Sequence, residues 1–89
     1  LIKSMGRSFG QMHKNGNTIE YVDLHLMAHG LGRALGSVGE VTVVNPPIPV
    51  DEDARPIALF LAGFLEGVLG GTYDGECTRN KCVFKRLNI

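Results

Sequence analysis

The stretch "IALFLAGFLEGVLG", residues 57–70, most constrains what this chain can fold into. It is apolar nearly all round, which is typical of a helix that is buried on every side. Glu66 interrupts the run, and nowhere does the chain reach the roughly 18 apolar residues that a membrane span needs. We therefore expect a central buried helix over residues 55–69. Small side chains four positions apart would let another backbone approach it closely; they are Ala58 and Ala62, and Gly63 and Gly67.

Size and charge narrow the range of functions. Eighty-nine residues make one small domain, and nine basic residues balance nine acidic ones. Such a balance gives no electrostatic reason to bind nucleic acid or an anionic membrane, and Lys3 and Arg7 look like solvated surface. Because the chain begins with Leu1, we expect residues 1–89 to be a single domain within a longer protein. Two cysteines are too few for a secreted disulfide scaffold, which favours the cytoplasm.

Two helices are predicted upstream of the central one. The first spans residues 2–14 and ends at "NGN", residues 15–17. Its Gly6 and Gly10 form a stripe open to close approach, beside an apolar stripe at three- and four-residue spacing; the apolar residues are Ile2, Met5, Phe9 and Met12. His13, next to Lys14 at the end of this helix, favours the helix dipole.

The second predicted helix starts with Asn17 as N-cap and Glu20 three residues on, and it runs to about Leu35. It has two apolar stripes on nearly opposite sides, so we expect it to be sandwiched between elements or between subunits. The stripes are Leu24, Met27, Ala28, Leu31 and Leu35, and Ile19, Val22 and Leu26.

Strand patterns complete the predicted fold. "EVTVV", residues 40–44, alternates and is β-branched, and the prolines of "NPPIPV" end the strand. "ECTRNKCVFKRLNI", residues 76–89, indicates a hairpin with its loop at residues 78–81. The predicted order is α-α-β-α-β-β, an α+β fold with helices packed on a small antiparallel sheet.

The two cysteines leave several interpretations open. Cys77 and Cys82 have four residues between them, which is the upper limit for paired zinc ligands. His25 and His29 stand i, i+4, so a site of two cysteines and two histidines is conceivable, as is the cysteine pair with Glu76. Free cross-strand thiols, a hairpin-closing disulfide and ordinary buried small residues are the alternatives. For His25 and His29 the alternative is partial exposure with ordinary hydrogen bonds.

Glu66 is the single charge in the apolar helix, and two interpretations compete for it. It lies either at an exposed edge or paired in a pocket, where it would also meet a polar group on an apolar ligand. No base is indicated for a nucleophilic cysteine, and the sequence has no nicotinamide or flavin fingerprint. We therefore expect a protein without enzymatic activity.

The segments "PIALFLAGFLEGVLGG", "GEC" and "CVFKRL" together resemble the vinyl-4-reductase-type domain family, also called predicted hydrocarbon-binding domains. The upstream segments "MGRSFGQ" and "LGRALGSVGEVTVVN" are similar to that family as well. The resemblance implies an α+β sandwich related to the TRAPP transport-particle subunit fold. Members commonly dimerise and hold or sense a small hydrophobic molecule.

The resemblance also implies a metal site. In aromatic-compound-sensing regulators of this family, two hairpin cysteines, an acidic side chain and a cysteine near the glycine-containing helix bind a structural zinc. Here Cys77 and Cys82 match the hairpin cysteines, and Glu76 or Asp74 matches the acidic ligand. No cysteine stands at residues 55–60 to complete the set.

We thus expect a domain that binds or senses a small hydrophobic ligand and signals through a homodimer. The ligand would lie between helices and sheet, where plain core packing competes for the same side chains; these are Met27, Leu31, Phe60 and Phe64. One alternative is a dimerisation scaffold with residues 18–35 as its interface. A reductase subunit of pigment biosynthesis is a more distant one.

Overall fold

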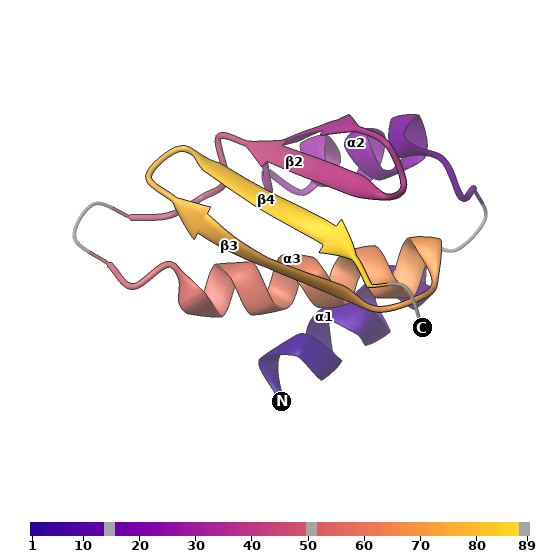
Figure 1. Ribbon diagram of the computed structural model, residues 1–89, viewed down its shortest axis with the longest axis horizontal. Helices are drawn as coiled ribbons and strands as arrows, with labels where there is room; N and C mark the ends of the chain where they lie inside the picture. Colours follow the sequence, from indigo (N-terminus) through magenta and orange to yellow (C-terminus); the bar gives the residue numbers. More distant parts are fainter. Residues whose placement is uncertain (14–15, 50–51, 88–89) are drawn as a thin grey trace.

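The computed structural model describes residues 1–13, 16–49 and 52–87 of the chain. Three helices and a four-stranded antiparallel sheet of order β1-β2-β4-β3 make up this part (Figure 1). The elements are α1 (Ile2–Gln11), α2 (Ile19–Ala28), β1 (Arg33–Gly36), β2 (Glu40–Val44), α3 (Arg55–Leu69), β3 (Tyr73–Thr78) and β4 (Lys81–Arg86). Across these ranges, no helix has both the length and the apolar character to cross a membrane.

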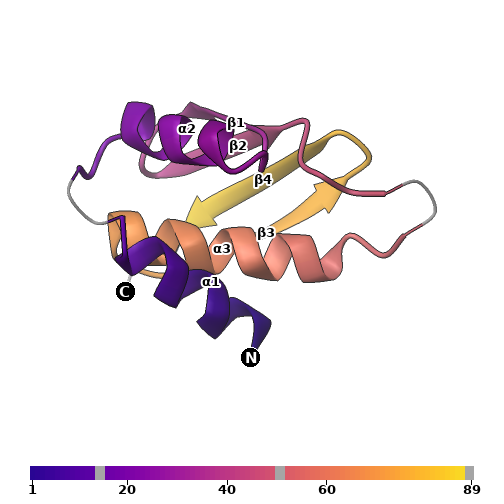
Figure 2. The ribbon, with the colours of Figure 1, turned by 180° about the vertical axis from the view of Figure 1, so that it is seen from behind.

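The elements form layers around one core. The buried side chains of α2 and α3 meet those of the sheet in a single cluster, and α1 packs on α3 (Figures 1 and 2). The largest fully buried side chains come from α2, α3 and the sheet and are Tyr73, Phe64, Phe84, Leu26, Leu61, Leu65, Val22, Val41, Val43, Val68 and Cys82. The predicted α+β class, with helices on an antiparallel sheet, is confirmed.

The main difference from the sequence prediction is the second helix. It ends at Ala28, and β1 occupies residues that were assigned to its last turns. Gly30 and Gly32 adopt φ values of 68° and 107°, a conformation that ends a helix and that few other residues tolerate. The observed order is therefore α-α-β-β-α-β-β, the predicted order with one strand added.

Smaller differences concern the element ends. Thr18, not Asn17, caps α2, because its hydroxyl oxygen accepts the Tyr21 N–H at 3.1 Å. β3 begins at Tyr73, three residues before the predicted hairpin. α1 ends at Gln11, and the predicted helix end at Lys14 and the start of the "NGN" stop lie outside the described residues.

Glycines hold α1 directly against α3. A Cβ atom at Gly6 would overlap the carbonyl of Phe60, and one at Gly63 would overlap the carbonyl of Lys3. Gly10 and Gly67 repeat this arrangement one turn further along. The predicted close approach is thus confirmed for both glycine stripes, since the two backbones touch without side chains between them.

Most side chains of the apolar stripe on α1 lie outside the core. Met5 is 58% exposed and Met12 is 76% exposed, whereas Phe9 packs against the core cluster. The glycine stripe, and not the apolar one, is the face of α1 that lies on α3. α1 therefore contributes to the fold through its backbone more than through its apolar side chains.

A buried carboxylate ties α1, α3 and β3 together. Glu66 on α3 accepts hydrogen bonds from Arg7 Nη2 at 2.7 Å and from the Tyr73 N–H at 2.9 Å, and Lys3 Nζ lies 2.9 Å from its Oε2. Lys3 also donates to the Tyr73 carbonyl at 3.0 Å. Lys3 and Arg7 are therefore partners of a buried charge and not merely solvated surface. Because Glu66 is buried and both of its carboxylate oxygens are paired, it does not lie at an exposed edge of the helix.

The electrostatics of Glu66 follow from these contacts. Burial alone would raise the pKa of its carboxyl, but the Tyr73 N–H, Lys3 and Arg7 outweigh burial and hold that pKa below its usual value. The carboxylate is therefore charged at neutral pH. Tyr73 extends the network, because its hydroxyl donates to the Val38 carbonyl at 2.6 Å, between β1 and β2.

We predict that Gly63→Ala strongly destabilises the domain. Its methyl group would meet the Lys3 carbonyl and the Arg7 N–H, so we expect a loss of about 2 kcal/mol or more in unfolding free energy, measured by urea denaturation. Gly39→Ala is the matched control, because the nearest atom to its Cβ would be the Ser37 hydroxyl at 3.9 Å. Equal stabilities of the two variants would contradict the backbone contact between α1 and α3.

Candidate functional site: a helix seam of phenylalanine and histidine rings

The cysteine hairpin contains a disulfide. Cys77 on β3 lies directly opposite Cys82 on β4, and their sulfur atoms are bonded to each other. Of the alternatives that the sequence left open, this structure has the hairpin-closing disulfide. Zinc ligands from cysteine are thiolates, so in this state neither sulfur is available to a metal.

Glu76 does not join the two cysteines in a metal site. Successive side chains of a strand point to opposite faces of the sheet, and along β3 Cys77 is half-buried whereas Glu76 and Asp74 are exposed. Glu76 lies opposite Val83, on the face away from the disulfide. The predicted set of Cys77, Cys82 and Glu76 is therefore not assembled around a common point here.

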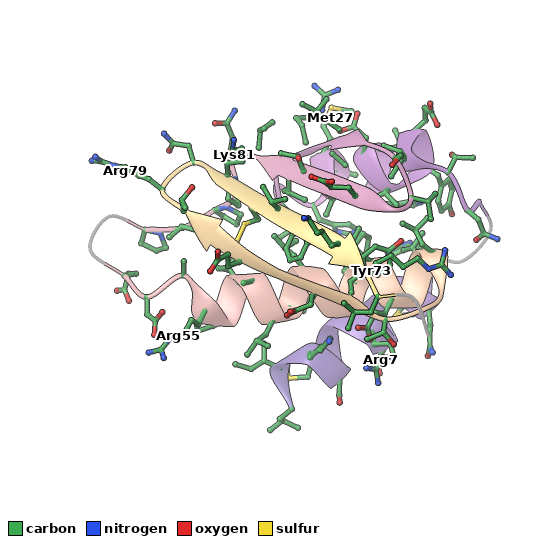
Figure 3. The ribbon with its side chains drawn as sticks, viewed as in Figure 1. Arg7, Met27, Arg55, Tyr73, Arg79 and Lys81 are labelled. Carbon is green, nitrogen blue, oxygen red and sulfur yellow. A yellow bond between two sulfur atoms is a disulfide. The ribbon has the colours of Figure 1, made fainter. Side chains whose placement is uncertain are left out.

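The four predicted ligand-lining residues take different positions. Phe64 is fully buried in the core, and Phe60 and Leu31 are half-buried. Met27 is 49% exposed, and Figure 3 shows it on the outer side of α2, away from α3. Met27 was assigned to the interior because its stripe was read as continuous with Leu31, but the helix ends before Leu31.

α2 contacts β1 and α1 in different ways. Its backbone lies close to β1, whereas it meets α1 mainly through aromatic and imidazole rings. Phe9 of α1 is central to this contact, with ring centroids 4.8 Å from His29, 5.7 Å from Phe64 and 6.0 Å from Phe60. We call this region the helix seam; it consists of Phe9, His13, His25, His29, Phe60 and Phe64.

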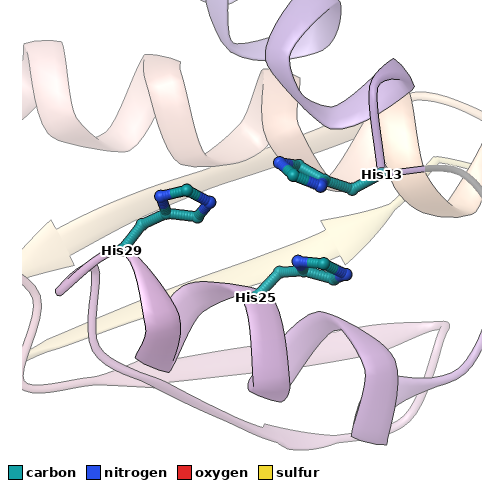
Figure 4. A group of neighbouring side chains, drawn as sticks. All are labelled: His13, His25 and His29. Carbon is teal, nitrogen blue, oxygen red and sulfur yellow. The ribbon is translucent and has the colours of Figure 1, made fainter.

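All three histidines of the chain lie in the helix seam (Figure 4). His13 follows α1, His25 is on α2 and His29 caps the C-terminal end of α2. The ring centroids of His13 and His25 are 4.3 Å apart and stacked, and those of His13 and His29 are 5.3 Å apart. One nitrogen atom from each ring lies within 4.8 Å of the others, close enough to hold a metal ion.

The surroundings of His25 favour its neutral form. Burial lowers the pKa of His25, and repulsion from the neighbouring His13 and His29 lowers it further. Tyr21 packs edge-on against His25, with ring centroids 4.4 Å apart. A neutral imidazole keeps a nitrogen lone pair, which can accept a hydrogen bond or bind a metal.

Sequence reasoning found only part of the seam. The i, i+4 spacing of His25 and His29 was visible, and Phe60 and Phe64 were expected at a ligand site. His13 was assigned only to the helix dipole and Phe9 only to an apolar stripe of the first helix, because nothing in the local pattern shows that the end of α1 lies against α2. The contact arises from the packing of α1 on α3.

Two surface hollows lie elsewhere, along the β3 edge of the sheet. One, of about 480 Å³, is on the outer face of β3 and β4, and the other, of about 270 Å³, lies between β3 and the start of α3. Neither is lined by a residue predicted to contact the hydrophobic ligand, although the predicted metal ligand Glu76 lines both and Cys77 lines the second. Their linings are Asp74, Gly75, Glu76, Val83, Lys85 and Leu87, and Ala54, Arg55, Ala58, Leu59, Gly75, Glu76 and Cys77.

We predict that purified protein, denatured without reductant, shows no free thiol and shows two after reduction. Cys77→Ser with Cys82→Ser should lower the unfolding free energy by about 2 kcal/mol, because the short loop is then no longer closed in the unfolded chain. Two free thiols in the unreduced protein, with zinc in its elemental analysis, would contradict the disulfide and restore the zinc hypothesis. They would also agree better with the cytoplasmic location expected from the sequence.

Comparison with known proteins supports the fold. No model of a known protein family matches this chain, and no curated protein does. Among solved structures, a vinyl-4-reductase family protein from Methanocaldococcus jannaschii is similar, with a TM-score of 0.63 and 21% sequence identity. The match covers all of this chain and 68% of that one. The chain therefore has a vinyl-4-reductase-type fold, as its resemblance to that family predicted.

Proposed function

We propose that this domain is a non-enzymatic module that binds a small hydrophobic molecule in the helix seam. The observation that carries the proposal is that α2 meets α1 through rings rather than through close backbone packing. Contacts of this kind can be exchanged for contacts with a ligand without opening the glycine interface or the sheet. The likeness to a vinyl-4-reductase family protein supports the choice of fold only.

The composition of the helix seam suggests the class of ligand. Phe9 and Phe60 are half-buried, and Phe64 lies beneath them in the core. Aromatic rings in offset or edge-on arrangements attract further rings, so a small aromatic or alicyclic compound fits this surface best. The seam histidines would supply a hydrogen bond to one polar group on such a compound.

Ligand binding in the helix seam would also change the surface that the domain presents to a partner. A ligand between α1 and α2 would displace α2 relative to α3, and the outer side of α2 carries the exposed Leu24 and Met27. A ligand that prefers one position of α2 would shift the population of that position. The change would then reach any partner that contacts the outer side of α2.

We predict that N-phenyl-1-naphthylamine, a neutral fluorescent hydrophobe, binds saturably with one molecule per chain and that naphthalene displaces it. Phe60→Ala should weaken this binding at least about tenfold, because it removes one ring of the seam. Leu59→Ala is the control, since Leu59 is the neighbouring residue but is exposed. Circular dichroism would verify that both variants fold. Absence of saturable binding, or equal effects of the two variants, would contradict the proposal.

A second candidate function is a dimerisation scaffold that needs no ligand. The buried Val22 and Leu26 show one face of α2 in the core, while Leu24 and Met27 remain 54% and 49% exposed on another. Large apolar side chains exposed together are typical of an interaction surface. The interface would be α2 itself and not the longer helix expected from the sequence.

For this candidate we predict that the protein sediments as a dimer at micromolar concentration and that Leu24→Glu makes it a monomer. A charge in the centre of an apolar interface would be buried without a partner. Leu59→Glu, at a similarly exposed leucine on α3, should leave the dimer intact. A wild-type protein that stays monomeric at about 100 µM would rule out this function while leaving ligand binding testable.

A further inference from the structure

The three seam histidines have a geometry that their packing role does not require. His25 and His29 are one helical turn apart on α2, and His13 reaches the same point from the end of α1. Four residues of separation on a helix is a spacing at which two histidines bind one metal ion. The third imidazole comes from a different element, so the cluster depends on the tertiary fold.

His13 provides an independent sign of a missing partner. Its Nε2 atom is buried, yet it forms no hydrogen bond to any of the residues at 1–13, 16–49 and 52–87. Buried polar atoms of side chains nearly always have a partner, and a buried polar atom without one lowers the stability of the fold. A group that binds a nitrogen lone pair at this point would remove that loss of stability.

We propose that His13, His25 and His29 form a binding site for a divalent transition-metal ion such as Zn²⁺. Imidazole nitrogen binds Zn²⁺ at about 2.0–2.1 Å, and three protein ligands leave a fourth position for water. Tetrahedral ligands at this distance are roughly 3.3 Å from one another. The nitrogen atoms, which now lie within 4.8 Å of one another, would therefore have to move by about 1 Å through rotation of their side chains. His29 is exposed and His25 half-buried, which leaves the rings of α2 room to turn.

The site would join α1 to α2 across the helix seam. α1 is already fixed on α3 by its glycines, so the ion would hold α2 in one position relative to the central helix. The proposal does not rest on the hydrophobic ligand. Metal binding and ligand binding can each fail while the other holds.

The test begins with disulfide-intact protein that has been freed of metal by a chelator and titrated with ZnCl₂ in a calorimeter. We expect one ion per chain and a rise in melting temperature, with Ni²⁺ and Cu²⁺ also binding and Mg²⁺ and Ca²⁺ not binding. His13→Gln, His25→Gln and His29→Gln should each weaken Zn²⁺ binding at least about tenfold. Glu20→Gln on α2 and Glu76→Gln on the hairpin are controls that should bind like wild type.

A second measurement keeps the proposal testable where a variant does not fold. Because the chain has three histidines and all lie in this cluster, its proton NMR spectrum should contain three imidazole spin systems. We expect all three to shift together and to saturate at one equivalent of Zn²⁺. Movement of one or two signals only, or weak binding that the controls reduce equally, would overturn the site.

Discussion

The contact between the glycines of α1 and α3 determines the rest of this structure. Gly6 and Gly10 on one helix and Gly63 and Gly67 on the other remove the side chains that usually separate helices, so backbone meets backbone. This spacing brings Lys3 and Arg7 within reach of Glu66, which lies 59 residues from Arg7 in the sequence. The contact also fixes the position of the C-terminal end of α1 in space, and hence the place where His13 meets α2.

The side of α2 that faces the sheet and the side that faces α1 consequently differ in how they are packed. On the sheet side, Val22 and Leu26 are fully buried, and the Asp23 carboxylate accepts the Ala34 N–H at 2.8 Å and pairs with Arg33. On the side of α1, contacts pass through ring edges and faces. A small molecule or a metal ion in the helix seam would therefore act on α2 through its less tightly packed side, with the sheet as a fixed support.

The sequence predicted those features that local patterns determine. The central helix was predicted with the observed bounds, since an apolar run between prolines and paired glycines has few other solutions, and β2 was predicted from its alternation. β1 was missed because an apolar periodicity continued across Gly30 and Gly32, whose positive φ values end the helix. The pairing of Glu66 and the position of His13 could not be predicted, because both join segments that are distant in sequence and carry no shared local signal.

The glycine contact has a consequence for where this domain can be cut. A chain lacking residues 1–11 would leave the Glu66 carboxylate buried with the Tyr73 N–H as its remaining partner among the contacts described above. It would also uncover the backbone along Gly63 and Gly67, which has no side chains to shield it from water. The first helix, although most of its side chains are exposed, thus covers the backbone of α3 and pairs with its buried charge, so a minimal folding unit must contain it.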